Sequence, residues 1–305
     1  MPKIWDAHNH WMPPEIAEQT SFFKRGWTDI DALLKTLDKL HVEKAVLLYP
    51  NSDAHLKLGW VKLCALYNEA LANKVKEHPT RLIGAGILPV DNPKEMFREL
   101  HRIKQMGLSA LSLASSYEGK YLDDPSFLPV LEMAEKEKLP VFVHSQIINP
   151  IGYERVQDPL LMPVIEYIFD MTMSVGKLMM SGALARLKNL KIVFGHFAGV
   201  LPFIADRFDS TYAMLRSRNM VPDIGNVPTD ILKNVFVDTS GTTSPAILEM
   251  AIGFFGPARV LWGSDFPAKK DLKESITVLE HSAGTIEDRE NMLAGNLMNI
   301  FNPQG

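Results

Sequence analysis

The sequence predicts an α/β protein built as a (β/α)8 barrel, and three observations lead to this class. Eight short apolar runs rich in β-branched residues recur along the 305 residues, each followed by polar or glycine residues. Stretches with helical periodicity separate these runs, which is the alternation that parallel strands require. No internal repeat or Gly/Ser-rich linker interrupts the pattern, so we expect residues 1–305 to form a single domain.

The predicted strands share a near-continuous apolar character, which is typical of strands that are buried on both faces. In chain order they are residues 3–8, 44–49, 82–88, 108–114, 140–144, 191–196, 235–238 and 259–262. A parallel sheet of this size, covered by helices on its outer face, closes most simply into a barrel.

Helices are expected between these strands from the spacing of apolar residues and from the residues at their ends. The apolar residues of segment 58–78 fall on one helical face, and the segment ends before Pro79. Pro93 opens a second helix, and Ser126 is predicted to cap a third that ends before Lys138.

Two connections exceed the usual short loop, namely residues 11–28 after the first strand and 145–161 after the fifth. Long loops after barrel strands lie at the face where such barrels place their active sites, so both are candidate substrate covers. Ordinary surface elaboration is the alternative. The first loop holds aromatic residues and one cation that form either a lid or part of the core: Trp11, Phe22, Phe23, Arg25 and Trp27.

The composition points to a globular protein without a strongly charged partner. Apolar residues make up 46% of the chain, and the formal net charge of -4 is not gathered into blocks, so we expect no nucleic-acid or membrane partner. Cys64, the only cysteine, lies in an apolar run and is predicted to be a buried, inert thiol. Because no apolar segment approaches the ~20 residues that span a bilayer, we expect a cytoplasmic protein.

Side chains with metal-binding chemistry stand at the carboxyl ends of several predicted strands. His8 and His10 end the first strand, and residues two apart in a strand point to the same face. His144, His196 and Asp265 close three further strands. A histidine is costly in an apolar strand unless its ring nitrogens are satisfied, so chance placement is a poor explanation. The sequence therefore predicts a metal site at this end of the barrel.

Five motifs, in this order, make the sequence similar to a known family over nearly its whole length. They are DAHNH at residues 6–10, LPVFVH at 139–144, FGHFAG at 194–199, DTSG at 238–241 and GSDFP at 263–267. They resemble the amidohydrolase-related branch of the amidohydrolase superfamily, which includes aminocarboxymuconate semialdehyde decarboxylase and the hydroxybenzoate decarboxylases. These motifs are specific for the fold and the metal site rather than for the reaction.

The resemblance implies a site with one metal ion, held by His8, His10, His144 and Asp265, with His196 beside the metal-bound water. Three imidazoles and one carboxylate suit Zn²⁺, while Mn²⁺ or another divalent ion is the alternative. Relatives with two metals bridge them with a carboxylated lysine from the fourth strand. Residues 108–115 contain no lysine, which favours a single ion.

Arg207 lies eleven residues after His196, the spacing at which relatives carry an arginine that reaches a substrate carboxylate from the neighbouring subunit. The resemblance thus implies a homodimer. A helix-surface ion pair of Arg207 with Asp206 or Asp209 is the alternative. Asp238 is interpreted as the cap of the helix that follows it.

The resulting hypothesis is a metal-dependent decarboxylase of a small unsaturated or aromatic carboxylate, in which His196 and Asp265 transfer the proton. The alternative is a hydrolase that opens a lactone, ester or amide at the same residues. A third possibility is a metal centre that only stabilises a binding scaffold, and His196, as a fifth polar group, argues against such a closed site.

Overall fold

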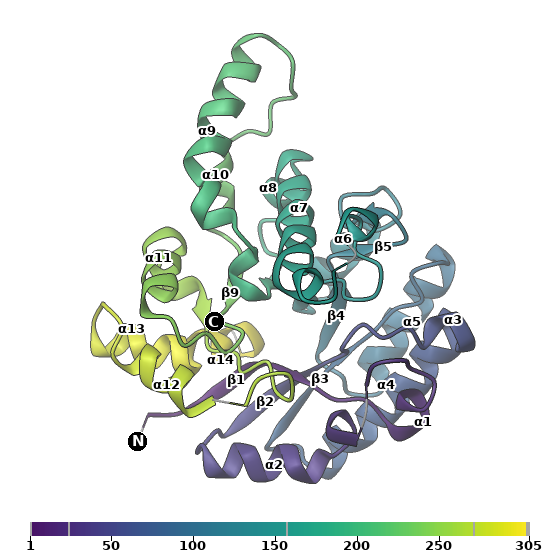
Figure 1. Ribbon diagram of the computed structural model, residues 1–305. Helices are drawn as coiled ribbons and strands as arrows, with labels where there is room; N and C mark the ends of the chain where they lie inside the picture. The colour runs from purple at the N-terminus through teal and green to yellow at the C-terminus, as the bar shows by residue number, and fades with distance from the viewer. Residues whose placement is uncertain (1, 24, 157, 271, 303–305) are drawn as a thin grey trace.

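Eight parallel strands form one sheet that curls into a nearly closed barrel in the computed structural model, which describes residues 2–23, 25–156, 158–270 and 272–302 (Figure 1). Within this sheet, each strand pairs with the one that follows it in chain order, so the predicted (β/α)8 fold is confirmed. The strands are β1 (Trp5–His10), β2 (Lys44–Leu48), β3 (Leu82–Gly86), β4 (Ala110–Ala114), β7 (Val141–His144), β8 (Ile192–Phe194), β9 (Phe236–Asp238) and β10 (Val260–Leu261).

The barrel closes where the first strand meets the end of the last. The amide of Ala7 donates to the carbonyl of Trp262 at 3.0 Å, and the amide of Asp265 donates to the carbonyl of His8 at 2.8 Å. The Asp6 carboxylate adds a side-chain link, because it accepts from the backbone amide of Ser264 at 2.9 Å. These hydrogen bonds form a seam that joins β1, the first strand of the barrel, to the end of β10, the last strand.

Helices cover the outside of the sheet (Figure 1). They are α1 (Pro14–Ala17), α2 (Ile30–Lys39), α3 (His55–Leu58), α4 (Trp60–Glu77), α5 (Pro93–Gln105), α6 (Leu128–Lys136), α7 (Tyr167–Met180), α8 (Ala183–Arg186), α9 (Leu201–Ser217), α10 (Pro228–Leu232), α11 (Pro245–Phe255), α12 (Leu272–Glu280), α13 (Ile286–Glu290) and α14 (Asn296–Phe301). Among the described residues, none of these helices is long and apolar enough to cross a membrane.

Shorter elements complete the fold. A small antiparallel hairpin pairs β5 (Ser116–Tyr117) with β6 (Lys120–Tyr121). Single π-helical turns at Met162–Glu166 and Asn291–Gly295 lead into α7 and α14. In the part of the chain that the structure describes, 3₁₀ turns lie at Arg25–Trp27, Tyr153–Arg155, His196–Ala198 and Pro257–Arg259.

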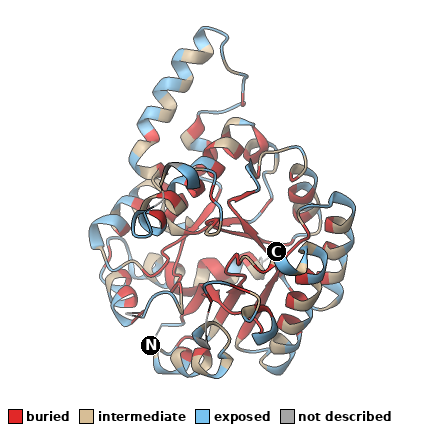
Figure 2. Ribbon diagram, turned by 45° about the vertical axis from the view of Figure 1, so that its right-hand side comes forward, coloured by how far each residue is buried: buried red, intermediate tan, exposed pale blue. Residues whose placement is uncertain are grey.

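Two apolar layers pack on opposite faces of the strands, which explains their near-continuous apolar sequence. The larger layer lies between strands and helices and includes Cys64, whose thiol is buried as predicted. The smaller layer fills the barrel interior with Val46, Phe142 and their neighbours, and residues of α14 pack against it. Figure 2 shows the buried residues concentrated on the strands.

One segment stands away from the barrel. Most of α9 and the loop after it project outward and are largely exposed, and α10 then returns to pack against α7 and α8 (Figures 1 and 2). We call residues 201–232 the arm. Large apolar side chains on the arm face solvent, among them Phe203 at 80% exposure and Met220 at 66%.

The long connection after β7, residues 145–161, is held to the barrel by a buried carboxylate of α7. Asp170 accepts hydrogen bonds from the hydroxyls of Ser115 and Ser116 and from the amide of Ile151 at 3.0 Å. The amide of Gln146 in turn donates to the Ser115 hydroxyl at 2.8 Å. These bonds fix the first part of the connection, at Gln146 and Ile151, beside the carboxyl end of β4.

Candidate metal centre

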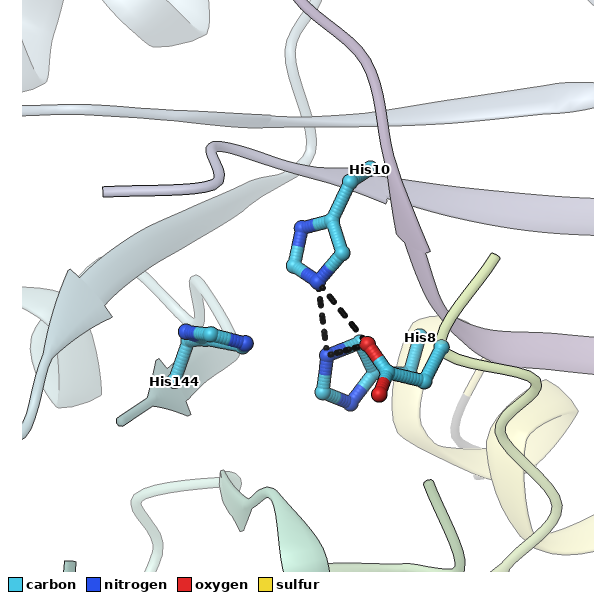
Figure 3. A group of neighbouring side chains, drawn as sticks. His8, His10 and His144 are labelled. Atoms are coloured by element: carbon cyan, nitrogen blue, oxygen red, sulfur yellow. Dashed lines mark hydrogen bonds and ion pairs between the residues drawn. The ribbon is translucent and has the colours of Figure 1, made fainter. Parts of the chain in front are cut away.

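His8 and His10 project together from the end of β1 and are almost completely buried. Their Nε2 atoms lie 3.0 Å apart (Figure 3). The strand pairs with β2 up to His10, and its register shifts between Asp6 and Asn9. Each imidazole thus directs one ring nitrogen at the same point.

His144 reaches that point from the end of β7 (Figure 3). Its ring centroid lies 4.7 Å from that of His10 and 5.1 Å from that of His8. Its Nδ1 lies 2.8 Å from the Ser145 carbonyl, to which only a protonated nitrogen can donate. The Nε2 lone pair of His144 is therefore available to a cation. The amide of Asn51 packs beside this pair and donates to the same carbonyl at 3.2 Å.

Asp265 completes the group from the loop that follows β10. Its Oδ1 lies 3.3 Å from Nε2 of His10 and 3.7 Å from Nε2 of His8. Its backbone adopts a left-handed conformation with φ of 59°, which turns the carboxylate toward the histidines. Burial opposes ionisation, but the hydrogen bond with His10 and the charge of His8 hold the pKa of this carboxyl well below its usual range.

The four side chains fit a single divalent ion. One donor atom from each of His8, His10, His144 and Asp265 lies within 4.8 Å of the others. Ligands bound at about 2.0–2.1 Å in a tetrahedral zinc site are separated by roughly 3.3 Å, which is close to the distances given above. Nitrogen and carboxylate donors also suit Mn²⁺. The fourth strand, β4, contains no lysine that could bridge a second metal ion at this site.

The histidines differ in charge because their surroundings differ. Burial lowers the pKa of His10 and His144, so both are neutral at pH 7 and present a lone pair. Burial acts on His8 in the same direction, but the adjacent Asp238 carboxylate raises the pKa of His8 to about 9. Before a metal binds, the site at pH 7 thus holds two neutral imidazoles and one imidazolium, His8, which is paired with the buried Asp238 carboxylate.

His196 stands next to this group at the start of a turn that follows β8. Its ring centroid lies 5.6 Å from that of His8 and 5.9 Å from that of His144. Burial lowers its pKa, so the imidazole is neutral at pH 7 and can accept a proton. The structure therefore brings together all five residues that the sequence singled out at the strand ends.

Arg207 lies apart from these residues, on the exposed surface of α9 in the arm. No ion pair joins it to another described residue. Asp209, one of its two expected partners, instead accepts hydrogen bonds from the amide and hydroxyl of Thr229 at 3.0 and 2.6 Å.

The first long loop divides its aromatic residues between core and site. Trp11 and Phe23 are buried in the core, whereas Phe22 is 68% exposed. Trp27 is half-buried, and its ring centroid lies 5.6 Å from that of His10. The side chain of Arg25 lies outside the described part of the chain. Of the aromatic residues described in this loop, Trp27 is thus the one whose ring borders a metal ligand.

Asp238 is the site residue whose contacts the sequence did not indicate. It was interpreted as a helix cap, but α11 begins at Pro245 and is capped by Ser244. The Asp238 carboxylate instead accepts a hydrogen bond from Nδ1 of His8 at 2.9 Å. The DTSG motif places the aspartate at the end of a strand, yet nothing local to the motif reveals a partner on β1.

A barrel with three histidines and an aspartate gathered at the carboxyl ends of its strands defines a class, the metal-dependent barrel enzymes. Within this class, the chain belongs to the amidohydrolase family, whose family model matches residues 5–296.

Relatives of known activity support this placement. The chain is 30% identical over 292 residues to 2-amino-3-carboxymuconate-6-semialdehyde decarboxylase of Dictyostelium discoideum, covering 90% of this chain and 76% of the relative. It is 27% identical over 245 residues to gamma-resorcylate decarboxylase of Polaromonas sp., covering 77% and 74% of the two chains.

Solved structures show the same fold. The crystal structure of 5-carboxyvanillate decarboxylase from Sphingomonas paucimobilis superimposes with a TM-score of 0.88 at 21% identity, covering 99% of each chain. A dihydroxybenzoic acid decarboxylase from Polaromonas sp., solved with bound manganese and the inhibitor 2-nitroresorcinol, gives a TM-score of 0.86 at 21% identity, covering 100% of this chain and 98% of the other.

Proposed function

We propose that this protein is a metal-dependent decarboxylase of a small unsaturated or aromatic carboxylate. The observation that carries the proposal is the convergence of four metal-binding side chains beside a neutral fifth histidine. The named activities of the relatives agree with it, since those at 30% and 27% identity are both decarboxylases.

One divalent ion would be held by His8, His10, His144 and Asp265. The donor set favours Zn²⁺, and the manganese bound in a structurally similar decarboxylase makes Mn²⁺ the principal alternative. When bound, the ion supplies a Lewis acid that holds the substrate carboxylate or an oxygen next to it. Elemental analysis of the purified protein distinguishes the two metals and tests for one ion per chain.

The remaining chemistry is the movement of one proton. When the bond to the carboxylate breaks, CO₂ leaves and its electron pair stays on the substrate carbon, where a proton must be added. We expect His196 and Asp265 to move that proton, and the position of both side chains beside His8 supports this. Trp27, beside His10, offers an aromatic face against which a flat substrate can pack.

The proposed functional unit is a homodimer in which Arg207 serves the site of the neighbouring subunit. Two features of the arm support this: its exposed apolar side chains and the absence of an ion pair for Arg207 among the described residues. A guanidinium is suited to bidentate binding of a carboxylate.

Mixed dimers test the shared site. When an Arg207→Ala chain is combined with a His196→Ala chain, some dimers contain one site with both residues intact. We therefore expect activity above that of either parent. Mixed dimers that demonstrably form but stay as inactive as their parents would place Arg207 outside the partner's site.

The reaction itself is tested by a substrate screen on the metal-loaded protein. A panel of hydroxybenzoates, unsaturated acids, lactones and esters is assayed both for CO₂ release and for ring or ester opening. Decarboxylation predicts CO₂ release in proportion to substrate loss. Ring or ester opening without CO₂ release would replace the decarboxylase by a hydrolase.

A further inference from the structure

Asp238, at the end of β9, uses its two carboxylate oxygens for two different parts of the site. It is only 1% exposed. Its Oδ2 accepts the hydrogen bond from Nδ1 of His8 at 2.9 Å. When a metal displaces the Nε2 proton of His8, a proton held on Nδ1 leaves the Nε2 lone pair facing His10 and Asp265. This oxygen therefore fixes the tautomer of His8 that can bind a metal.

The other oxygen acts through Ser240. Oδ1 of Asp238 accepts from the hydroxyl of Ser240 at 2.5 Å and from its backbone amide at 2.9 Å. The Ser240 hydroxyl in turn accepts from the backbone amide of His196 at 3.0 Å. The His196 amide also lies 3.4 Å from Oδ1 itself. The backbone of His196 is thus attached to the same carboxylate as the ring of His8.

This attachment matters because the turn that carries His196 has an uncommon backbone. His196, Phe197 and Ala198 have φ values of 52°, 55° and 60°, so three consecutive residues with side chains are left-handed. Such conformations persist only where surrounding contacts impose them. The bonds to Ser240 and Asp238 hold the first of the three, and the amide of Ala198 donates to the Gly195 carbonyl at 3.0 Å.

We propose that Asp238 is a positioning residue that couples the metal ligand His8 to the proton-transfer residue His196. This proposal rests on the proposed function only in treating His8 as a metal ligand and His196 as a proton-transfer residue. Asp238 itself acts through its neighbours: one oxygen sets the His8 tautomer and the other, with Ser240, sets the place of the His196 ring.

Asp238→Asn tests the hydrogen bonds of this side chain rather than its packing, because asparagine has nearly the same shape as aspartate. The amide oxygen can still accept from Ser240, whereas the amide NH₂ would face Nδ1 of His8. That NH₂ favours the tautomer with the proton on Nε2, which leaves no lone pair of His8 facing His10 and Asp265. Ser240→Ala leaves the 2.9 Å bond between Asp238 and Nδ1 of His8 in place. It removes the hydroxyl that accepts from His196 and that also lies 3.2 Å from Nδ1 of His8.

The test compares the unaltered protein with Asp238→Asn and Ser240→Ala. Zn²⁺ affinity is measured by competition with a chromophoric chelator, and the visible spectrum of the Co²⁺-loaded protein reports ligand geometry. For Asp238→Asn we expect affinity to fall roughly 10- to 100-fold, with a changed Co²⁺ spectrum. For Ser240→Ala, which loses only the longer of the two contacts with Nδ1 of His8, we expect a much smaller loss of affinity than for Asp238→Asn, a lower kcat and an unchanged KM.

Asp170→Asn is the matched control, since it alters a buried carboxylate that touches none of these residues and should leave metal affinity unchanged. Asp238→Asn with unaltered Zn²⁺ affinity would overturn the proposal. If that variant does not fold, ¹⁵N chemical shifts of labelled histidines in the unaltered Zn²⁺-bound protein show which ring nitrogen of His8 carries the proton. A proton on Nε2 would overturn the proposal as well. An unaltered protein that binds no metal would instead refute the proposed function.

Discussion

Replacing Gly263 by alanine tests whether the metal centre depends on the close approach of the barrel's last strand to its first. A Cβ atom at Gly263 would lie 2.8 Å from Cβ of His8 and 3.2 Å from Cβ of Asp238. Ordinary contact begins at 3.4 Å, so His8 and residue 263 must separate by about 0.6 Å. Because Cβ of His8 is fixed to the backbone, β1 itself has to move.

The size of the effect follows from this displacement. Metal–ligand distances tolerate deviations of about 0.2 Å, so a shift of His8 three times larger disturbs the ligand set. Overpacking of a buried site costs about 1–3 kcal/mol. If metal release relieves that strain, affinity falls roughly 5- to 150-fold.

The assay is chelator competition for Zn²⁺, together with urea unfolding of the metal-free protein followed by circular dichroism. Gly253→Ala is the matched control, because Gly253 lies within α11 with no atom within 4 Å of its would-be Cβ. This control should gain about 0.5–1 kcal/mol in stability, as expected for a helical glycine, and retain its metal affinity. A Gly263→Ala protein with unchanged metal affinity and unchanged stability would refute the reasoning.

Three further predictions concern single side chains. His8→Ala and Asp265→Ala should each lose bound metal and activity together, as measured by elemental analysis and turnover; an active variant without metal would contradict the ligand assignment. His196→Ala should keep its metal while kcat falls roughly 10²- to 10⁴-fold, and near-normal turnover would leave it with a structural role only. Asp170→Ala leaves two buried serine hydroxyls without their acceptor, so the free energy of unfolding should fall by about 1–3 kcal/mol in urea titrations. An unchanged unfolding midpoint would show that this carboxylate does not stabilise the fold.

All eight strands were predictable because each is an apolar run buried on both faces, but their ends were less so. The first strand was expected at residues 3–8 and is observed at Trp5–His10. Its polar end stays in the sheet because Asn9 and His10 still pair with β2, which no local pattern reveals.

One predicted helix start was wrong for a similar reason. Ser126 was expected to cap a helix, but its hydroxyl donates to the Asp124 carboxylate at 2.6 Å and the helix begins at Leu128. A short polar side chain that finds a nearby acceptor in the turn is no longer available to the helix amides.

The gathering of five residues at the strand ends could be predicted because parallel strands all end on one face of a barrel. The contact of Asp238 with His8 could not, because it joins strands that are far apart in the chain and depends on side-chain orientation. The place of Arg207 relative to a substrate stays a prediction for the same reason, since it involves a second chain.

The seam between β1 and the end of β10 also bears on how the protein is made. His8 and Asp265 face each other across it although they are almost the full length of the chain apart. On the ribosome the two histidines of β1 emerge first and their carboxylate partner emerges last. A nascent chain therefore cannot assemble the four-ligand group until Asp265 has been synthesised. Tight metal capture would then distinguish chains that include Asp265 from every shorter one.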